Sequence, residues 1–192
     1  MNITARPAII QDIEGVQAML SHGMQGKHYR GDLAWDETST DDESLSAIIE
    51  AGNLYIAEGP DGPVGTFMLF WEDPARWGQQ PPIAGYLHRF VVGPGLRGQH
   101  VGDQILDLAA QEVANHGKQY LRLTCPAGNH RLQAYHLAHG FTRADSKATA
   151  QHTTTPIVYF ERAVVDTPEQ QTQPTRRSFA QRLRQILLRA EE

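Results

Sequence analysis

The stretch GPGLRGQHVGDQ, residues 93 to 104, decides how the rest of the chain is interpreted. It follows the apolar run YLHRFVV (86 to 92) and leads into VGDQILDLAAQEV (101 to 113), whose apolar residues repeat with helical spacing. Glycines between a strand and a helix let phosphate oxygens approach backbone N–H groups, and the helix dipole favours the anion. The stretch is therefore predicted to bind a phosphate group.

The literal pattern G-x-G-x-x-G of residues 93 to 98 also occurs in dinucleotide-binding folds, but its context here differs from theirs. In those folds the pattern opens the first strand–helix turn, and an acidic residue at the end of the next strand binds the ribose. In this chain the next strand ends in Leu123, Thr124 and Cys125, and the pattern follows a predicted hairpin. A P-loop fits less well still, because no Lys-Ser or Lys-Thr pair follows the glycines.

Composition narrows the function classes. The chain has 192 residues, 40% of them hydrophobic and 20% charged, and a net charge of -5. These values predict one domain with a substantial core and give no reason to expect nucleic acid as a partner. The single cysteine, Cys125, excludes an internal disulfide and a Cys-rich zinc site. The sequence shows no signal-peptide pattern and no apolar stretch near the roughly 20 residues of a membrane span, so we expect a cytoplasmic protein.

Hydrophobic periodicity predicts a mixed α/β domain over residues 1 to 163, with the element order β-α-α-β-β-β-α-β-α-β-β. Residues 21 to 40 and 72 to 82 are expected to be irregular. We interpret residues 164 to 177 as a linker and residues 178 to 192 as a basic amphipathic helix. That helix is expected to dock on its own domain or on a second subunit, as in a homodimer, with a membrane surface or another partner as the alternative. Strands are expected at 3–7, 53–58, 63–71, 84–92, 119–126, 141–145 and 156–164, and helices at 9–20, 41–52, 101–116 and 129–139.

A second motif, which begins later in the loop, is more informative than the G-x-G-x-x-G pattern. Residues 97 to 102, RGQHVG, are close to the motif R/Q-x-x-G-x-G/A of the GCN5-related N-acetyltransferase (GNAT) family, and VGPGLRG (92 to 98) resembles that family's V-x-P-x-x-R-G. Further on, Asn129, Ala134, Tyr135 and the Gly140–Phe141 pair resemble the family's N-x(7–10)-GF segment, which closes over the pantetheine arm of coenzyme A. Together with the order of elements, the resemblance covers residues 1 to 163.

The resemblance implies a GNAT-like fold, with a mostly antiparallel central sheet of six to seven strands and helices on both faces. It implies acetyl-CoA as co-substrate and direct transfer of the acetyl group to a primary amine of a small molecule or peptide. The strand at 84–92 would run beside the acyl-pantetheine, and the glycine loop would bind the pyrophosphate. The expected coenzyme A contacts are Phe90, Val91, Val92, Arg97, Gly98, Gln99, His100, Val101, Gly102, Asp103 and Asn129.

The chain departs from the family at both positions that carry protons. Many relatives have a tyrosine four residues before the glycine of the GF pair, which donates a proton to sulfur; here that residue is His136, with Tyr135 beside it. We expect His136 to donate as an imidazolium. Many relatives also have an acidic residue five before Asn129, where this chain has Thr124, which cannot act as a base at neutral pH. We expect His88 to replace that base, with its side chain facing opposite to those of Leu87 and Arg89 on the same strand. A packed structural histidine is the alternative for both positions.

Three further expectations concern ligands. His136 and His139 are three positions apart but have no acidic or cysteine partner nearby in the sequence, so no metal site is expected. His100 replaces the first glycine of the R-x-x-G-x-G pattern. A helical backbone there would need no glycine, and histidine is also among the residues that better tolerate a positive φ, so we expect its N–H to bind while its ring points away or meets a phosphate. The acceptor amine is expected to be cationic, because aromatic and acidic residues gather in residues 21 to 40 and 71 to 84. Those residues are Asp32, Trp35, Asp36, Glu37, Trp71 and Trp77.

A second class of function is compatible with the same pattern. The substitutions at the family's acid and base positions and at His100 also suit an acyl-CoA-binding sensor or adaptor that catalyses no transfer. The two classes differ in a measurable way, because only an enzyme releases free thiol from acetyl-CoA when an amine is added.

Overall fold

The structure is a computed structural model that describes residues 1–28, 40–96, 98–144 and 156–164, the side chains of 25–28 excepted. Its strands are β1 (Thr4–Pro7), β2 (Leu54–Gly59), β3 (Gly62–Phe70), β4 (Ala84–Val92), β5 (Tyr120–Pro126), β6 (Thr142–Arg143) and β7 (Ile157–Ala163). Its helices are the 3-10 turn η1 (Ile10–Asp12), α1 (Ile13–His28), α2 (Asp42–Glu50), α3 (Pro74–Trp77), α4 (Val101–Asn115) and α5 (His130–Ala138). The predicted order of strands and longer helices is confirmed, and η1 and α3 are added to it.

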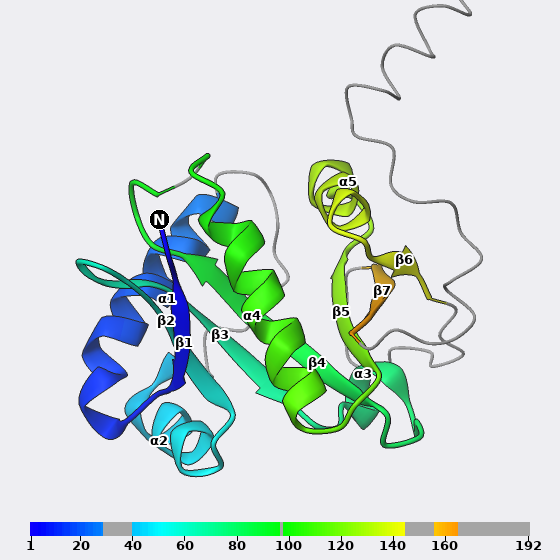
Figure 1. The fold of residues 1–192 in the computed structure, drawn as a ribbon, viewed down its shortest axis with the longest axis horizontal. Helices are drawn as coiled ribbons and strands as arrows, with labels where there is room; N and C mark the ends of the chain where they lie inside the picture. The colour runs from blue at the N-terminus through cyan, green and yellow to red at the C-terminus, as the bar shows by residue number, and fades with distance from the viewer. Residues whose placement is uncertain (29–39, 97, 145–155, 165–192) are drawn as a thin grey trace, which may run out of the picture.

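Seven strands form one sheet in the order β1-β2-β3-β4-β5-β7-β6 (Figure 1). Neighbouring strands are antiparallel except for β4 and β5, which are parallel because α4 crosses over the sheet between them. The predicted mixed, mostly antiparallel sheet of six to seven strands is therefore confirmed.

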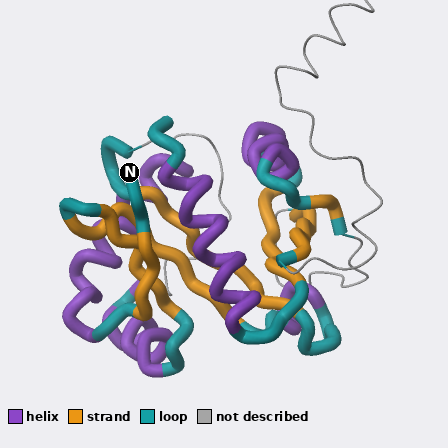
Figure 2. Tube along the Cα trace, in the orientation of Figure 1, coloured by secondary structure: helices purple, strands orange, loops and turns teal. Residues whose placement is uncertain are grey.

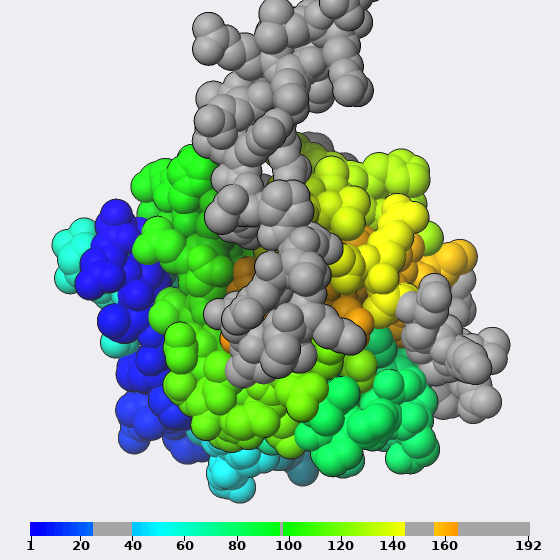
Figure 3. All heavy atoms as spheres, turned by 45° about the vertical axis from the view of Figure 1, so that its right-hand side comes forward, coloured from blue at the N-terminus to red at the C-terminus, as the bar shows by residue number. Residues whose placement is uncertain are grey.

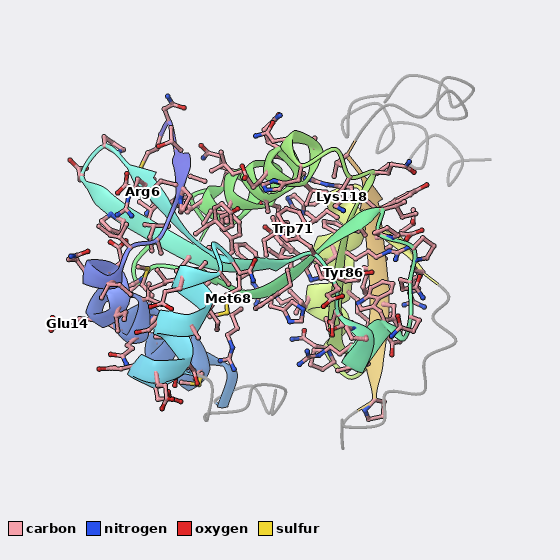
Figure 4. The ribbon with its side chains drawn as sticks, turned by 90° about the horizontal axis from the view of Figure 1, so that it is seen from below. Arg6, Glu14, Met68, Trp71, Tyr86 and Lys118 are labelled. Atoms are coloured by element: carbon pink, nitrogen blue, oxygen red, sulfur yellow. The ribbon has the colours of Figure 1, made fainter. Side chains whose placement is uncertain are left out.

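Helices cover both faces of the sheet. Figure 2 shows the purple helices around the orange strands, and the view from below in Figure 4 places α4 above the sheet and α1 and α2 beneath it. In Figure 4, Trp71 lies on the α4 side and Met68 on the α1 side, as the alternation of β-strand side chains requires. The α4 face buries Ile105, Leu106, Ala109 and Val113, and the other face buries Val16, Leu20, Leu45 and Ile49. No helix among the described residues is both long and apolar enough to cross a membrane.

Helix α1 is longer than the sequence predicts. Residues 21–28 are helical, although their polar, glycine-containing sequence is typical of a loop. Packing on the sheet explains the difference: Leu20 is buried, and a Cβ at Gly23 would lie 3.0 Å from Val91 Cγ2 of β4. The missing side chain lets the helix approach the strand, and this contact outweighs the low helix propensity of glycine. The rest of the predicted loop, the linker after residue 164 and the C-terminal helix lie outside the described residues.

Strand β4 carries a bulge near its middle. The β3–β4 register shifts between Thr66 and Met68, so that Arg89 and Phe90 of β4 together face one residue of β3. Arg89 has a φ of 45°, a left-handed conformation of the kind that bulges use. The extra residue reverses the alternation, so Phe90 packs on the α4 face, where an uninterrupted strand would turn it to the opposite one.

Candidate active site

β4 and β5 pair at their beginnings and then diverge. The ladder between them has three pairs, after which β4 continues along β3 and β5 continues along β7. Figure 1 shows the two strands spreading apart toward the N-terminus of α4. The edge of β4 from His88 to Val92 therefore makes no ladder with β5. The three pairs are Ala84–Tyr120, Gly85–Leu121 and Tyr86–Arg122.

A backbone donor of β4 points into this divergence. The N–H of Gly93 donates to the carbonyl of Val64 at 2.8 Å, so it faces β3. The carbonyl oxygen of Val91 also faces β3, because a Cβ at Gly65 would lie 2.6 Å from it. The N–H and C=O groups of one strand residue point to one edge and those of the next residue to the other edge. The N–H of Val92, between Val91 and Gly93, therefore points toward β5. An N–H in this position can stabilise negative charge on an acyl oxygen, an effect worth about 3 kcal/mol.

The glycine loop leads into an uncapped helix N-terminus. Gly95 and Gly98 have φ values of 76° and 80°, which glycine adopts without strain. His100 is the N-cap residue of α4, and its side chain makes no capping hydrogen bond. The first N–H groups of the helix are thus left for an anion, which the helix dipole favours. Arg97 lies outside the described residues.

His100 has a left-handed backbone, with φ 60° and ψ 16°, so the positive φ is the one of its two expected conformations that the structure has. The turn into α4 needs this conformation, which explains why the family pattern has glycine here, and histidine tolerates it better than most residues. The exposed ring of His100 contacts the Asp103 side chain. Its Nδ1 lies 2.7 Å from Asp103 Oδ2, and 83% of the side chain is exposed.

The start of α4 packs against the second half of β4 and against α5. A Cβ at Gly102 would lie 2.8 Å from the Tyr135 hydroxyl, 3.4 Å from Phe90 Cζ and 3.5 Å from Val92 Cγ2. Glycine is the residue that allows this approach. Four of the expected site residues, from three elements, therefore lie together. In Figure 3, green α4 runs down the left of that face, the yellow-green α5 region lies at the upper right, and the blue-green α3 segment lies at the lower right.

Asp103 joins α4 to α5 through a polar network. Its Oδ1 accepts a hydrogen bond from the Tyr135 hydroxyl at 2.9 Å and lies 2.9 Å from His139 Nε2, while Oδ2 faces His100. Burial works to raise the pKa of Asp103, but the hydrogen bonds from His100 and Tyr135 and the charge of His139 outweigh it and lower that pKa. Asp103 is therefore a carboxylate at neutral pH.

A carboxylate next to a pyrophosphate site would by itself oppose phosphate binding. Two features reduce this effect. His139 Nδ1 lies 2.6 Å from the Tyr135 carbonyl while Nε2 faces Asp103, so one oxygen of the carboxylate is engaged by this ring. The carboxylate oxygens are also bound to side chains, so they do not cap the helix N–H groups. The start of α4 therefore fits a phosphate despite Asp103.

Tyr135 keeps its proton at neutral pH. Burial, together with the hydrogen bond to Asp103 and the charge of that carboxylate, raises the pKa of the phenol. Its hydroxyl is the side-chain atom nearest the Cβ position of Gly102, where Phe90 also packs, at the side of the divergence where α4 begins. Tyr135 is thus a protonated donor at the place where the sequence expects coenzyme A.

His136 lies in an apolar pocket. The side chain is 4% exposed, and its ring contacts Phe141 and Phe160 at centroid distances of 5.6 Å each. Burial, followed by the charge of His139, lowers the pKa of His136 to about 4. The ring is therefore neutral at pH 7, which goes against the expectation that it donates a proton as an imidazolium. Within the described residues no carboxylate contacts the ring to stabilise that form.

His88 has a different neighbour. Its Nε2 lies 3.0 Å from Oδ2 of Asp73, in the segment between β3 and β4. The His88 side chain is 20% exposed and that of Asp73 is 7% exposed. His88 pairs with Met68 across the ladder, so it faces the α1 side of the sheet, opposite to Leu87 as the sequence predicts.

Two expected contacts, Val91 and Val101, can act only through the backbone, and Gln99 and Asn129 make local hydrogen bonds. Val91 packs against α1, and Val101 is buried under the sheet side of α4, so neither side chain is accessible. Gln99 donates to the Gly95 carbonyl at 3.1 Å. Asn129 is the N-cap of α5, where its Oδ1 accepts from the Leu132 N–H at 2.9 Å.

The two described tryptophans are not arranged to bind an acceptor cation. Trp77 is 3% exposed, and the Arg122 guanidinium already lies 5.0 Å from its ring centroid. Trp71 stacks on His116 at 4.0 Å, on the α4 side of the sheet and away from His88. The expected cation–π role is therefore wrong for both. The acidic residues and Trp35 of the same expectation lie outside the described residues.

Asp73 is the site residue that the sequence analysis missed. It lies in a segment interpreted as irregular, yet it is the N-cap of α3 and is followed by a proline at the first helical position. Asp followed by Pro is a recognisable helix start, and this signal predicts the cap. The contact with His88, fifteen positions further along the chain, leaves no local signal.

Comparison with known proteins agrees with this arrangement. Residues 22–141, more than half of the chain, match the acetyltransferase (GNAT) family. The uncharacterized N-acetyltransferase YesJ of Bacillus subtilis (strain 168) is 23% identical over 158 residues, which are 77% of this chain and 86% of YesJ.

Solved structures share the fold at low sequence identity. A GNAT family acetyltransferase from Listeria monocytogenes 4b F2365 is similar with a TM-score of 0.67 and 18% identity, over 84% of this chain and 94% of that chain. The PaiA N-acetyltransferase from Thermoplasma acidophilum, solved in complex with coenzyme A, is similar with a TM-score of 0.65 and 16% identity, over 85% and 99% of the two chains. The chain belongs to the GNAT family of acetyltransferases.

Proposed function

We propose that the protein is an N-acetyltransferase that moves an acetyl group directly from acetyl-CoA to a primary amine of a small molecule or peptide. The observation that carries the proposal is the divergence of β4 and β5 beside the uncapped N-terminus of α4. A strand edge with a free N–H suits an extended acyl-pantetheine chain, and a helix start suits a pyrophosphate. The coenzyme A complex of PaiA, which has the same fold, supports this choice of co-substrate.

The reaction needs an activated acyl carbon, which the thioester of acetyl-CoA supplies. The amine nitrogen bonds to this carbon, the carbon–sulfur bond breaks, and the sulfur takes up a proton to become a thiol. The amine gives one proton to His88, which passes it to solvent. The N–H of Val92 stabilises the negative charge that builds up on the acyl oxygen, which lowers the barrier to attack.

Tyr135 is the better candidate on α5 for the hydrogen bond to the departing sulfur. Its hydroxyl lies beside Gly102 and Phe90, and its raised pKa keeps it protonated across the physiological range. To act, the phenol would exchange its bond to Asp103 for one to sulfur. Asp103 would keep the contacts with His100 and His139, so the exchange leaves no carboxylate without a donor.

Thiol release from acetyl-CoA tests this proposal. The full-length protein is assayed with polyamines, aminoglycosides, arylalkylamines, amino acids and peptides, and we expect acceptor-dependent release of one thiol for each amine acetylated. If acetyl-CoA raises the melting temperature but no amine releases thiol, the protein is an acyl-CoA-binding module instead. Turnover with neutral or anionic acceptors alone would overturn the expectation that the acceptor is cationic.

A further inference from the structure

We infer that Asp73 is a positioning residue of the acetyl transfer, which holds the imidazole of His88 so that Nδ1 is the nitrogen that accepts the proton of the amine. The inference rests on the proposed function, because it names the residue that makes His88 an effective base. Asp73 belongs to the segment between β3 and β4, and nothing in the sequence around it indicates this role.

The contact between the two residues is buried on the carboxylate side. Asp73 Oδ2 lies 3.0 Å from His88 Nε2, a close contact that does not meet hydrogen-bond geometry, and among the described residues this oxygen has no hydrogen-bond partner. The Arg76 guanidinium is the next charged group, with Nη1 3.9 Å from the same oxygen. A buried carboxylate oxygen requires a donor, and His88 is placed to be that donor.

The two oxygens of Asp73 have separate tasks. Oδ1 accepts from the Arg76 N–H at 3.2 Å and caps the short helix α3, while Oδ2 faces the imidazole. The cap fixes the carboxylate relative to the backbone. The edge of the Phe70 ring, with its centroid 5.3 Å from that of His88, restricts the imidazole from another side. The ring is therefore held between two groups on neighbouring segments.

This arrangement selects the tautomer. A carboxylate can only accept a hydrogen bond, so Nε2 of His88 carries the hydrogen and Nδ1 carries the lone pair. His88 Nδ1 forms no hydrogen bond with the described residues, so it is open to a proton from an acceptor amine. When Nδ1 takes that proton, the ring becomes positive and the Asp73 charge stabilises it, so the pair lowers the barrier at the step where the charge forms.

The substitution Asp73→Asn separates the two tasks of the residue. Asparagine keeps a carbonyl oxygen for the α3 cap, at which it is as favourable as aspartate. Its NH2 group replaces Oδ2, however, and donates to Nε2, which moves the ring hydrogen to Nδ1 and blocks the base. We expect kcat to fall about tenfold or more, with the KM for acetyl-CoA and the melting temperature nearly unchanged.

Asp41→Asn is the matched control. Asp41 is also an N-cap aspartate, whose Oδ1 accepts from the Ser44 N–H at 2.8 Å at the start of α2, and it faces no histidine in the described residues. This variant should keep the wild-type kcat. A similar loss of activity in both variants would mean that helix capping, and not the contact with His88, is responsible.

A double-mutant cycle with His88→Ala separates positioning from structure. If Asp73 acts through His88, adding Asp73→Asn to His88→Ala lowers kcat no further, whereas a structural role lowers it by the same factor in both backgrounds. Equal losses in the two backgrounds overturn the inference.

Nitrogen NMR of the imidazole rings distinguishes failure of the inference from failure of the proposed function. The His88 signals, identified by their absence in His88→Ala, should show the Nε2–H tautomer in the wild-type protein and the Nδ1–H tautomer in Asp73→Asn. If the wild-type protein shows this tautomer but transfers no acetyl group, the proposed function fails and the contact stands. If it transfers acetyl groups with His88 in the other tautomer, the role of Asp73 is disproved.

Discussion

His88 and His136 lie in opposite surroundings on the two sides of the β4–β5 divergence. His88 is partly exposed beside a carboxylate, whereas His136 is buried between two phenylalanines, and its Nδ1 forms no hydrogen bond within the described part of the chain. A nearby carboxylate stabilises the positive ring that forms on proton uptake, and an apolar pocket destabilises it. Whether a histidine can carry a proton therefore depends on its environment in the folded protein and not on its place in a motif.

The largest effect should separate the two histidines in the acetyl-transfer assay. Removing a general base costs roughly 100-fold in rate, so His88→Ala should lower kcat by about that factor. His136→Phe should leave kcat nearly unchanged, since a neutral, buried ring carries no proton in the reaction. A loss of the same size in His136→Phe would break the comparison, as long as the melting temperature of that variant equals that of the wild type.

Acid pH should reveal His136 through stability. Its pKa of about 4 in the folded state lies below the value near 6.5 in the unfolded chain, so the unfolded state binds the proton first. Above pH 6.5 the neutral ring of His136 does not lower the free energy of unfolding. As the pH falls from 6.5 toward 4, protonation of the unfolded chain lowers this free energy. At pH 5 the free energy of unfolding of the wild-type protein should therefore be lowered by about 2 kcal/mol through His136, and His136→Phe should not show this loss.

Urea unfolding at pH 7.5 and pH 5 measures this difference. The free energy of unfolding should fall more between these two pH values in the wild-type protein than in His136→Phe. His130→Ala removes an exposed histidine from the same helix and serves as the control. If the fall is equal in the wild type and in His136→Phe, the buried ring is not the group that titrates.

Tyr135→Phe should have an intermediate effect on the rate. Losing one hydrogen bond to the departing sulfur lowers kcat by about tenfold. Tyr55→Phe is the control, because burial and the nearby Glu112, to which its hydroxyl donates at 3.2 Å, raise the pKa of Tyr55 to about 12 in the same way. Tyr55 lies on β2, away from the divergence, so its loss should not alter kcat. Equal rates for wild type and Tyr135→Phe would remove Tyr135 from the mechanism.

The smallest effect should come from His100→Gly. Glycine adopts the left-handed backbone of residue 100 without steric strain, which stabilises the folded state. Glycine also gives the unfolded chain more conformational entropy, which offsets part of this gain, so the net stabilisation should be about 1 kcal/mol. The exposed contact with Asp103 contributes little, so the Kd for acetyl-CoA should change by less than about fivefold. Calorimetric titration measures the Kd. Much tighter binding in the variant would mark His100 as a weakening substitution and would favour the binding-module class over the enzyme.

The sequence predicted the strands, helices and turn around the site well, because these elements depend on local patterns. Alternation and helical spacing locate the strands and helices on either side of residues 93–104, and glycine spacing locates the turn between them. The alternation of β4 also predicted that His88 faces away from Leu87. These features need only the backbone preferences of a few neighbouring residues.

The environments of the side chains were not predictable in the same way. His136 was expected to carry a positive charge, since nothing near it in sequence shows that Phe160, from the last strand, closes its pocket. The sequence left a helical backbone and a positive φ both open for His100, and the turn into α4 requires the left-handed one. The bulge at Arg89 also left no pattern, because it is defined by the register against β3.

By itself, the sequence determined the order of elements, the glycine loop at the start of α4 and the resemblance that pointed to the family. Only the tertiary structure decided the partner of each polar side chain: Asp73 for His88, Asp103 for Tyr135, and an apolar pocket for His136. The physical reason is distance along the chain. Local conformation depends on the nearest residues, whereas burial and charge, which set the chemistry of a proton carrier, depend on segments brought together by folding.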